Sequence, residues 1–259
     1  MEFVSLTKTQ HLAEIALDRP EKYNCFNRQM ALELQTALDD CQEDEEVRAV
    51  YLTGTGKAFC SGQDLQEVTA EDAPSFSTIL SEHFNPIIIR LRELEKPVVC
   101  AVNGVAAGAG ANIALACDLT VAAESSSFIQ AFCKIGLIPD SGGTFFLPRL
   151  VGWQRAAGMM LLGDPLPAKE AERIGMIYAT YPDDSFAEES KALAQRLAAM
   201  PTKALAMTKR ALNYSMFNNE LEKQLAIEEQ LQSTAGLTED YQEGVRAFLE
   251  KRKPVFKGK

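Results

Sequence analysis

The sequence predicts an α/β protein with a layered core and a helical C-terminal third. Two apolar runs, AVYLTGTG at residues 49–56 and VVCAV at 98–102, have the length and composition of buried strands. Between them and the C-terminal third, residues 104–125 predict a glycine-rich turn, a helix of small residues and another short strand, which is typical of closely packed α/β layers. From about Ala168 onward, apolar residues recur three and four positions apart, and this spacing predicts helices.

The composition excludes several classes of protein. The chain has 259 residues, of which 46% are hydrophobic and 24% charged, so it can bury a large core and is not disordered throughout. Its 26 Lys and Arg against 36 Asp and Glu give a net charge of −10, which speaks against nucleic acid as the main partner. We find no secretory signal pattern and no apolar stretch of about 18 residues, so we expect a cytoplasmic protein without a membrane segment.

Cysteine and histidine provide no pattern typical of a metal site. The six cysteines are scattered without a C-x-x-C pair, and most lie in apolar runs, so we expect reduced, buried thiols. His11 and His83 have no cysteine or carboxylate neighbours at ligand spacing. A zinc site or a Ser-His-Asp relay is therefore not expected, and we predict no metal and no cofactor.

Periodicity and turn residues place the remaining elements. They predict, in chain order, a strand over residues 11–17 that ends at Asp18-Arg19-Pro20, a helix capped by Asn27, a loop at 57–65, a helix over about 74–95, and a second loop at 134–152.

Three segments could carry chemistry, and each has a plain structural alternative. Glycines 104, 108 and 110 stand between a strand and a helix, where unpaired amides can meet an anion or an oxyanion, although a tight packing turn explains them equally well. A dinucleotide site is discounted because Ile113 occupies the third glycine position of the fingerprint. Gly62 could turn the Gln63 amide into a cavity, or the same loop could be a surface turn in which Asp64 caps a helix.

The third segment is GLIPDSGG at residues 136–143. Apolar neighbours would raise the pKa of the Asp140 carboxyl and make it a plausible general base. The alternative is that Asp140 caps the helix that follows, and the pattern does not decide between the two.

Taken together, five segments in this order resemble the crotonase (enoyl-CoA hydratase/isomerase) superfamily. They are residues 16–27, 54–65, 96–128, 135–152 and 243–254. The resemblance implies a spiral of ββα units over residues 1–195, and a helical region over 196–259 that serves oligomerisation and closes the coenzyme A pocket. It also implies an acyl-CoA thioester substrate, with coenzyme A as part of that substrate, and a homotrimer or hexamer.

By position, the resemblance assigns the oxyanion hole to the backbone amides of Gln63 and Ala109, and catalysis to Asp140. The substrate-binding residues that it implies are Ser61, Gly62, Asp64, Leu65, Gly108, Phe132 and Lys251, the last from the basic chain end. Two amide donors are what a thioester enolate requires.

Departures from the superfamily pattern narrow the expected reaction. Hydratases of the superfamily activate water with two glutamates, and the matching positions here are Asn112 and Phe132. A single carboxylate can instead move a proton between carbons, so we expect an isomerase. Residues 136–152 look most like epoxyphenylacetyl-CoA isomerases of phenylacetate catabolism, ahead of Δ3,Δ2-enoyl-CoA isomerases. The alternatives are a weak hydratase, a non-catalytic CoA-ester-binding protein, and a nucleophilic role for the aspartate as in related dehalogenases.

Overall fold

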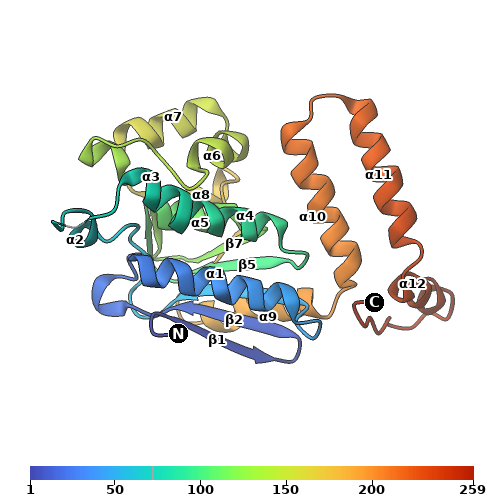
Figure 1. The fold of residues 1–259 in the computed structure, drawn as a ribbon. Helices are drawn as coiled ribbons and strands as arrows, with labels where there is room; N and C mark the ends of the chain where they lie inside the picture. The colour runs from blue at the N-terminus through green and yellow to red at the C-terminus, as the bar shows by residue number, and fades with distance from the viewer. Residues whose placement is uncertain (72) are drawn as a thin grey trace.

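The strands form two sheets in the computed structural model, which describes residues 1–71 and 73–259 (Figure 1). The described residues give a larger sheet in the order β1-β2-β3-β5-β7-β10 and a smaller one in the order β4-β6-β8-β9. Neighbouring strands are parallel except at β1 and β9. The strands are β1 (Val4–Thr9), β2 (Leu12–Leu17), β3 (Ala49–Gly54), β4 (Ala58–Cys60), β5 (Val98–Val102), β6 (Val105–Ala107), β7 (Leu119–Ala123), β8 (Ser127–Ile129), β9 (Leu166–Pro167) and β10 (Ala179–Tyr181).

Helices cover both sheets and make up the C-terminal part of the chain (Figure 1). The α-helices are α1 (Arg28–Glu43), α2 (Leu65–Val68), α3 (Phe76–Thr78), α4 (Asn85–Glu93), α5 (Ala109–Ala116), α6 (Gly143–Val151), α7 (Trp153–Leu162), α8 (Ala168–Arg173), α9 (Phe186–Ala198), α10 (Thr202–Phe217), α11 (Leu221–Ala235) and α12 (Glu239–Leu249). Shorter turns are η1 (Pro20–Lys22), the π-helical η2 (Ile79–Phe84) and η3 (Ala131–Ile135). No helix in the described part of the chain is long and apolar enough to cross a bilayer.

The strands repeat a single plan, and this confirms the predicted spiral of ββα units. In each of the pairs β3/β4, β5/β6 and β7/β8, the first strand joins the larger sheet and the second joins the smaller one, and helical segments follow. Because β4, β6 and β8 are parallel neighbours, their C-terminal ends lie along one edge of the smaller sheet. Three loops from distant parts of the sequence therefore meet there.

The larger sheet is buried on both faces, as its apolar strands predict. In β3, Val50 and Leu52 pack on one face with α1, α4 and α5, whereas Ala49 and Tyr51 pack on the other face with α9. Successive side chains of a strand point to opposite faces, so a continuous apolar run is needed where helices cover both sides. The predicted cap of α1 is also confirmed, since the Met30 amide donates to Asn27 Oδ1 at 2.9 Å.

The helix predicted over residues 74–95 is helical from α3 through α4, with a π turn between them. Proline lacks an amide hydrogen, so Pro86 cannot donate to the carbonyl one turn earlier. Gln35 of α1 supplies the missing donor, because its Nε2 donates to the carbonyls of Glu82 and His83 at 2.8 and 3.1 Å. The wider turn places His83 in the interior, where its side chain is buried.

Short elements were the main error of the sequence analysis. The predicted loop at 57–65 contains β4, and the predicted loop at 134–152 contains η3 and α6. Strands β1, β8, β9 and β10 were not predicted, and the predicted glycine-rich turn after VVCAV contains β6. Each of β4, β8 and β10 has three residues, too few for alternation of apolar and polar residues to be recognised.

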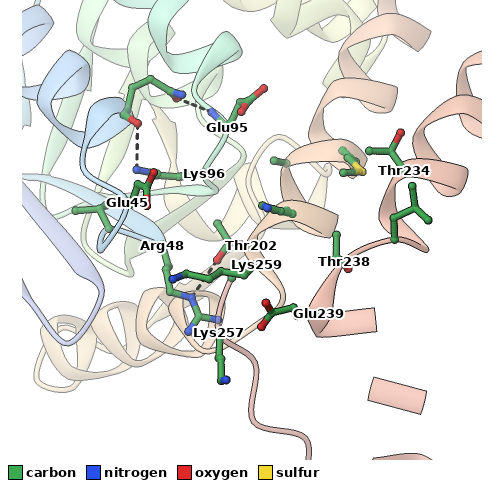
Figure 2. A pocket seen from close by; sticks show the side chains of 17 residues that line it. Glu45, Arg48, Glu95, Lys96, Thr202, Thr234, Thr238, Glu239, Lys257 and Lys259 are labelled. Atoms are coloured by element: carbon green, nitrogen blue, oxygen red, sulfur yellow. Dashed lines mark hydrogen bonds between the residues drawn. The ribbon is translucent and has the colours of Figure 1, made fainter. Parts of the chain in front are cut away.

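Helices α10–α12 extend away from the sheets after Pro201, at the right of Figure 1. Helix α9 still packs on the larger sheet, so the predicted domain boundary between residues 195 and 196 falls within a helix of the core. The division of the chain into two domains stays a prediction. A cavity of about 760 Å³ lies where α10–α12 and the chain end meet the core (Figure 2). Its buried cations are bound to protein: Arg48 donates to the Thr202 hydroxyl and the Phe256 carbonyl.

Candidate functional site

The candidate site lies along the edge where β4, β6 and β8 end. The loop after β4 carries Gln63, Gly108 links β6 to α5, and β8 leads through η3 to Asp140. The pairing of β6 with β8 continues one residue beyond β6, because the Gly108 amide donates to the Ile129 carbonyl at 2.8 Å. The fold thus brings the three segments that the sequence analysis singled out to one sheet edge.

The loops that carry Gln63 and Ala109 touch each other. Gly62 has a φ of +98°, and a side chain built on it would stand 3.1 Å from the Ala107 carbonyl and 3.6 Å from the Ala109 amide nitrogen. Only glycine fits both the backbone angle and the space. The Gln63 loop is also held by the backbone of Phe26, whose carbonyl accepts from the Asp64 amide and whose amide donates to the Gly62 carbonyl. The peptide group that bears the Gln63 amide is therefore fixed beside the first residue of α5.

Both of these amides are free to donate. Ala109 is the first residue of α5, so its amide has no acceptor within the helix. Among the residues that the structure describes, neither the Gln63 nor the Ala109 amide donates to a backbone or side-chain acceptor. Gly108, the residue before α5, has a φ of +53°, a backbone conformation that favours glycine. Two unpaired donors from touching loops can bind one negatively charged oxygen.

Asp140 is tied to the same helix that begins at Ala109. Its carbonyl accepts from the Asn112 side-chain amide and from the Gly143 backbone amide, both at 2.8 Å. Asn112 is three residues after Ala109, or about 4.5 Å along the helix axis at about 1.5 Å per residue. The segment that carries the carboxyl is thus anchored one helical turn from one of the two free amides.

The environment of the Asp140 carboxyl favours its neutral form. Burial raises its pKa above the ordinary value, and a hydrogen bond from the Ser141 hydroxyl to Oδ1 at 2.8 Å opposes part of that rise. The capping alternative is not what the structure shows. Gly142 is the residue before α6, and the Asp140 carboxyl accepts from Ser141 rather than from the first amides of that helix.

Asn112 and Phe132 are the two departures from the hydratase pattern. Both side chains are buried, but they contact different residues. Asn112 is fully buried and accepts from Gln130 Nε2 at 2.7 Å while it donates to Asp140. The Phe132 ring lies under Gly108, 3.7 Å from where a side chain on that glycine would begin. Neither residue provides a carboxylate that could activate water.

The predicted substrate-binding residues of the β4 loop differ in what they contact. Ser61 and Leu65 are exposed, so they are open to a ligand. Asp64 is buried, and it accepts from the Gln66 amide at 3.0 Å and from Arg19 Nη2 at 3.0 Å. For the Asp64 side chain the structure therefore shows the helix-cap alternative, supported by a buried ion pair.

Lys251 is not brought to the sheet edge within one chain. It follows α12, which lies on the far side of the molecule from α2 in Figure 1. Its side chain is exposed.

Sequence reasoning missed the residues that hold the site in shape. They are Ser141 and Gln130, described above, and Glu67, whose carboxylate accepts from Gln63 Nε2 at 2.7 Å and from the Arg28 amide at 2.8 Å. Gln130 has no sequence neighbour that points to its role, because its partner Asn112 is 18 positions away. Glu67 could have been found, because Gln63 and Glu67 stand four residues apart, at helical spacing. The described part of the chain holds no group of three His, Cys, Asp or Glu side chains placed to bind a metal.

Comparison with known proteins shows the family to which the chain is similar. The pattern of the family described as "Enoyl-CoA hydratase/isomerase" matches residues 7–259. The chain is 44% identical to the "1,2-epoxyphenylacetyl-CoA isomerase" of Escherichia coli over 262 residues, with all of both chains covered. It is 47% identical to a "Probable enoyl-CoA hydratase" of Rhodobacter capsulatus over 251 residues, which covers 97% of this chain and 96% of that one.

The fold agrees as well. The crystal structure of an enoyl-CoA hydratase from Bacillus anthracis superimposes with a TM-score of 0.92 at 32% identity, with all of both chains covered. Full-length matches in both sequence and structure leave no segment of the described chain outside the shared fold. The chain belongs to the enoyl-CoA hydratase/isomerase family.

Proposed function

We propose that this protein is an acyl-CoA isomerase that shifts a double bond through a thioester enolate, with Asp140 as the proton carrier. The observation that supports it most is the pairing of one half-buried carboxyl with two unpaired amides on linked segments. The Gln63 and Ala109 amides would hold the thioester oxygen, and Asp140 would act on the adjacent carbons. Membership of the family supports an acyl-CoA thioester as the substrate.

The proposed reaction needs only these groups. The Asp140 carboxylate removes a proton from C2 of a 3-enoyl thioester, and the electron pair of the broken C–H bond becomes part of the enolate. The negative charge grows on the thioester oxygen, where each amide donor stabilises the transition state, with removal of a single donor costing about 3 kcal/mol in other enzymes. The carboxyl then returns the proton to C4, which gives the conjugated 2-enoyl thioester. A pKa raised by burial suits a group that must both take and give a proton.

Hydration is a poorer fit to the side chains at this site. Water addition needs a base for the water and an acid for C2, and the two positions that supply carboxylates in hydratases hold Asn112 and Phe132. Asn112 is moreover engaged with Gln130 and Asp140, so its amide is not available to a water molecule.

The ring-epoxide thioester of phenylacetate catabolism is our first choice of substrate. The full-length identity of 44% to the Escherichia coli enzyme of that name supports it, together with the aspartate in GLIPDSGGT. An aliphatic 3-enoyl-CoA is the second choice, because removal of a C2 proton next to the thioester would begin both reactions. The exposed side chains of Ile135, Leu137 and Ile138, which precede Asp140, offer apolar surface to either acyl group.

We also propose that the protein works as a trimer or hexamer of identical chains. Helices α10–α12 expose large apolar side chains, among them Phe217 at 76% and Phe248 at 83%. Exposed apolar surface of this kind is typical of an interface between subunits. In such an assembly, Lys251 of one subunit could meet the coenzyme A phosphates bound to another.

The test compares the wild-type protein with Asp140→Asn on three thioesters, a ring epoxide, a 3-enoyl and a 2-enoyl, in deuterated water. We expect deuterium uptake and isomerisation in the wild type and loss of both in Asp140→Asn. Asp184→Asn, which changes an exposed carboxylate in the loop before α9, is the matched control and should keep full activity. Equal rates for Asp140→Asn and the wild type would remove Asp140 from the mechanism, and faster hydration than isomerisation would identify a hydratase instead.

A further inference from the structure

We infer that Asn112 is a positioning residue that holds the Asp140 segment in its working geometry, and that Gln130 in turn holds Asn112. This inference rests on the proposed function, because it gives the Asp140 carboxyl its task. Asn112 stands where the hydratases have a glutamate that activates water. In this protein the residue at that position would instead align the base.

The hydrogen bonds run in one direction through three segments of the chain. Gln130, just after β8, donates from Nε2 to Asn112 Oδ1 at 2.7 Å. Asn112, on α5, donates from Nδ2 to the Asp140 carbonyl at 2.8 Å. Both amide side chains lie away from solvent, since Asn112 is 0% and Gln130 2% exposed, and the bond to the Asp140 carbonyl is partly buried. Buried polar groups without water as an alternative hold their partners strongly.

Packing around the amide leaves it little freedom. A side chain on Gly143 would begin 2.7 Å from Asn112 Cγ, so only glycine at 143 lets the amide approach the Asp140 segment. Ser141 adopts a φ of +50°, in the left-handed region that costs energy for a residue with a side chain. Such a conformation persists only where the surrounding contacts impose it, and the Asn112 bond to the preceding carbonyl is one of these contacts.

The chemistry of the side chain explains why an amide serves here. Asn112 must accept from Gln130 and donate to a carbonyl, and only a group with both a donor and an acceptor does so. A carboxylate in its place could accept from Gln130, but its second oxygen would face the Asp140 carbonyl and repel it. The acid found in hydratases is therefore incompatible with this anchoring of Asp140.

The experiment uses Asn112→Asp, which keeps the size of the side chain, and Asn112→Ala, which removes the amide. Asn213→Asp is the matched control, because Asn213 also donates to a backbone carbonyl, that of Arg92 at 2.7 Å, but between α10 and α4. For each protein, kcat is measured on the thioester that the wild type isomerises, and the Kd is measured for a saturated acyl-CoA that cannot react. The pKa of the Asp140 carboxyl is measured by NMR in labelled protein.

We expect Asn112→Asp to lower kcat by about 10- to 100-fold while the Kd changes by less than about threefold, because alignment is lost and binding is kept. In Asn112→Ala, the pKa of Asp140 should fall toward its ordinary value as water reaches the loosened segment. Asn213→Asp should change neither quantity. A Gln130→Met change should lower kcat in the same direction, and the double variant with Asn112→Asp should be no slower than Asn112→Asp alone.

Three results would overturn the inference. The first is a folded Asn112→Asp protein with nearly wild-type kcat, and the second is an Asp140 pKa in Asn112→Ala equal to that of the wild type. The third is an equal loss of affinity and kcat in Asn112→Asp, since this indicates general damage. The NMR measurement does not depend on turnover. If the wild type isomerises no thioester while the Asp140 pKa still responds to Asn112, the proposed function fails and the positioning role stands.

Discussion

Gly110→Ala tests whether the contact between α5 and the end of β4 sets the rate. Gly110 is the second residue of α5, and a side chain on it would begin 2.7 Å from Cys60 Cβ and 2.5 Å from the Cys60 carbonyl. Carbon atoms in contact need about 3.5 Å, so α5 and the end of β4 must separate by about 0.8 Å. Overpacking of this kind costs about 1–3 kcal/mol of stability. The same movement draws the Ala109 amide away from the Gln63 amide.

A displacement of about 1 Å in reacting geometry can cost about 100-fold in rate. We therefore expect Gly110→Ala to fold with a lower melting temperature, and to isomerise a 3-enoyl-CoA about 100-fold more slowly, followed by the absorbance of the conjugated product. Gly158→Ala is the control, because Gly158 lies within α7 with open space around it. It should gain about 0.5–1 kcal/mol of stability and keep its rate. A folded Gly110→Ala protein with nearly full activity would refute the role of the amide pair.

Two further predictions concern titrating groups. Ser141→Ala removes the hydrogen bond that lowers the pKa of Asp140, so the pH below which kcat/KM declines should move upward; an unchanged or lower value would contradict the assigned contact. His83→Phe removes a buried ring whose nitrogens have no partner in the described chain, and should stabilise the fold by about 1–3 kcal/mol in urea unfolding. Burial lowers the pKa of His83, so as the pH falls below about 6.5 the histidine of the unfolded chain is protonated before that of the folded protein. Protonation of the unfolded chain destabilises the wild type but not His83→Phe. The difference in unfolding free energy between the two proteins should therefore grow as the pH falls from about 7 to about 5. A constant difference across that range would show that the histidine is not buried in neutral form.

Local signals in the sequence were sufficient for the long elements. The Asn27 cap and the spacing of Met30, Leu34 and Leu38 predict α1 because a helix is stabilised by contacts three and four residues apart. The run VVCAV coincides with β5 because both faces of that strand are covered. In both elements the cause of the structure is contained in the segment itself.

The parts that sequence analysis missed depend on contacts between distant segments. Strands β4 and β8 have three residues each, and they are strands only because β6 lies between them. The π turn at His83 depends on Gln35, which is 48 residues away. The positive φ of Ser141 likewise has no sequence signal, since serine favours that conformation no more than most residues.

The candidate site was predicted as separate pieces for the same reason. The Gln63 loop, the glycine cluster before α5 and Asp140 could each be singled out as a candidate, yet each also had a plain structural explanation. What distinguishes the explanations is the repeat, because three successive ββα units place the ends of β4, β6 and β8 side by side. One unit supplies one amide, the next supplies the other together with Asn112, and the third supplies the chain that Asn112 anchors. A change that lengthens any one of these strands by a residue would turn the side chains beyond it to the opposite face of the sheet, so the repeat must be preserved for the three groups to act on one substrate.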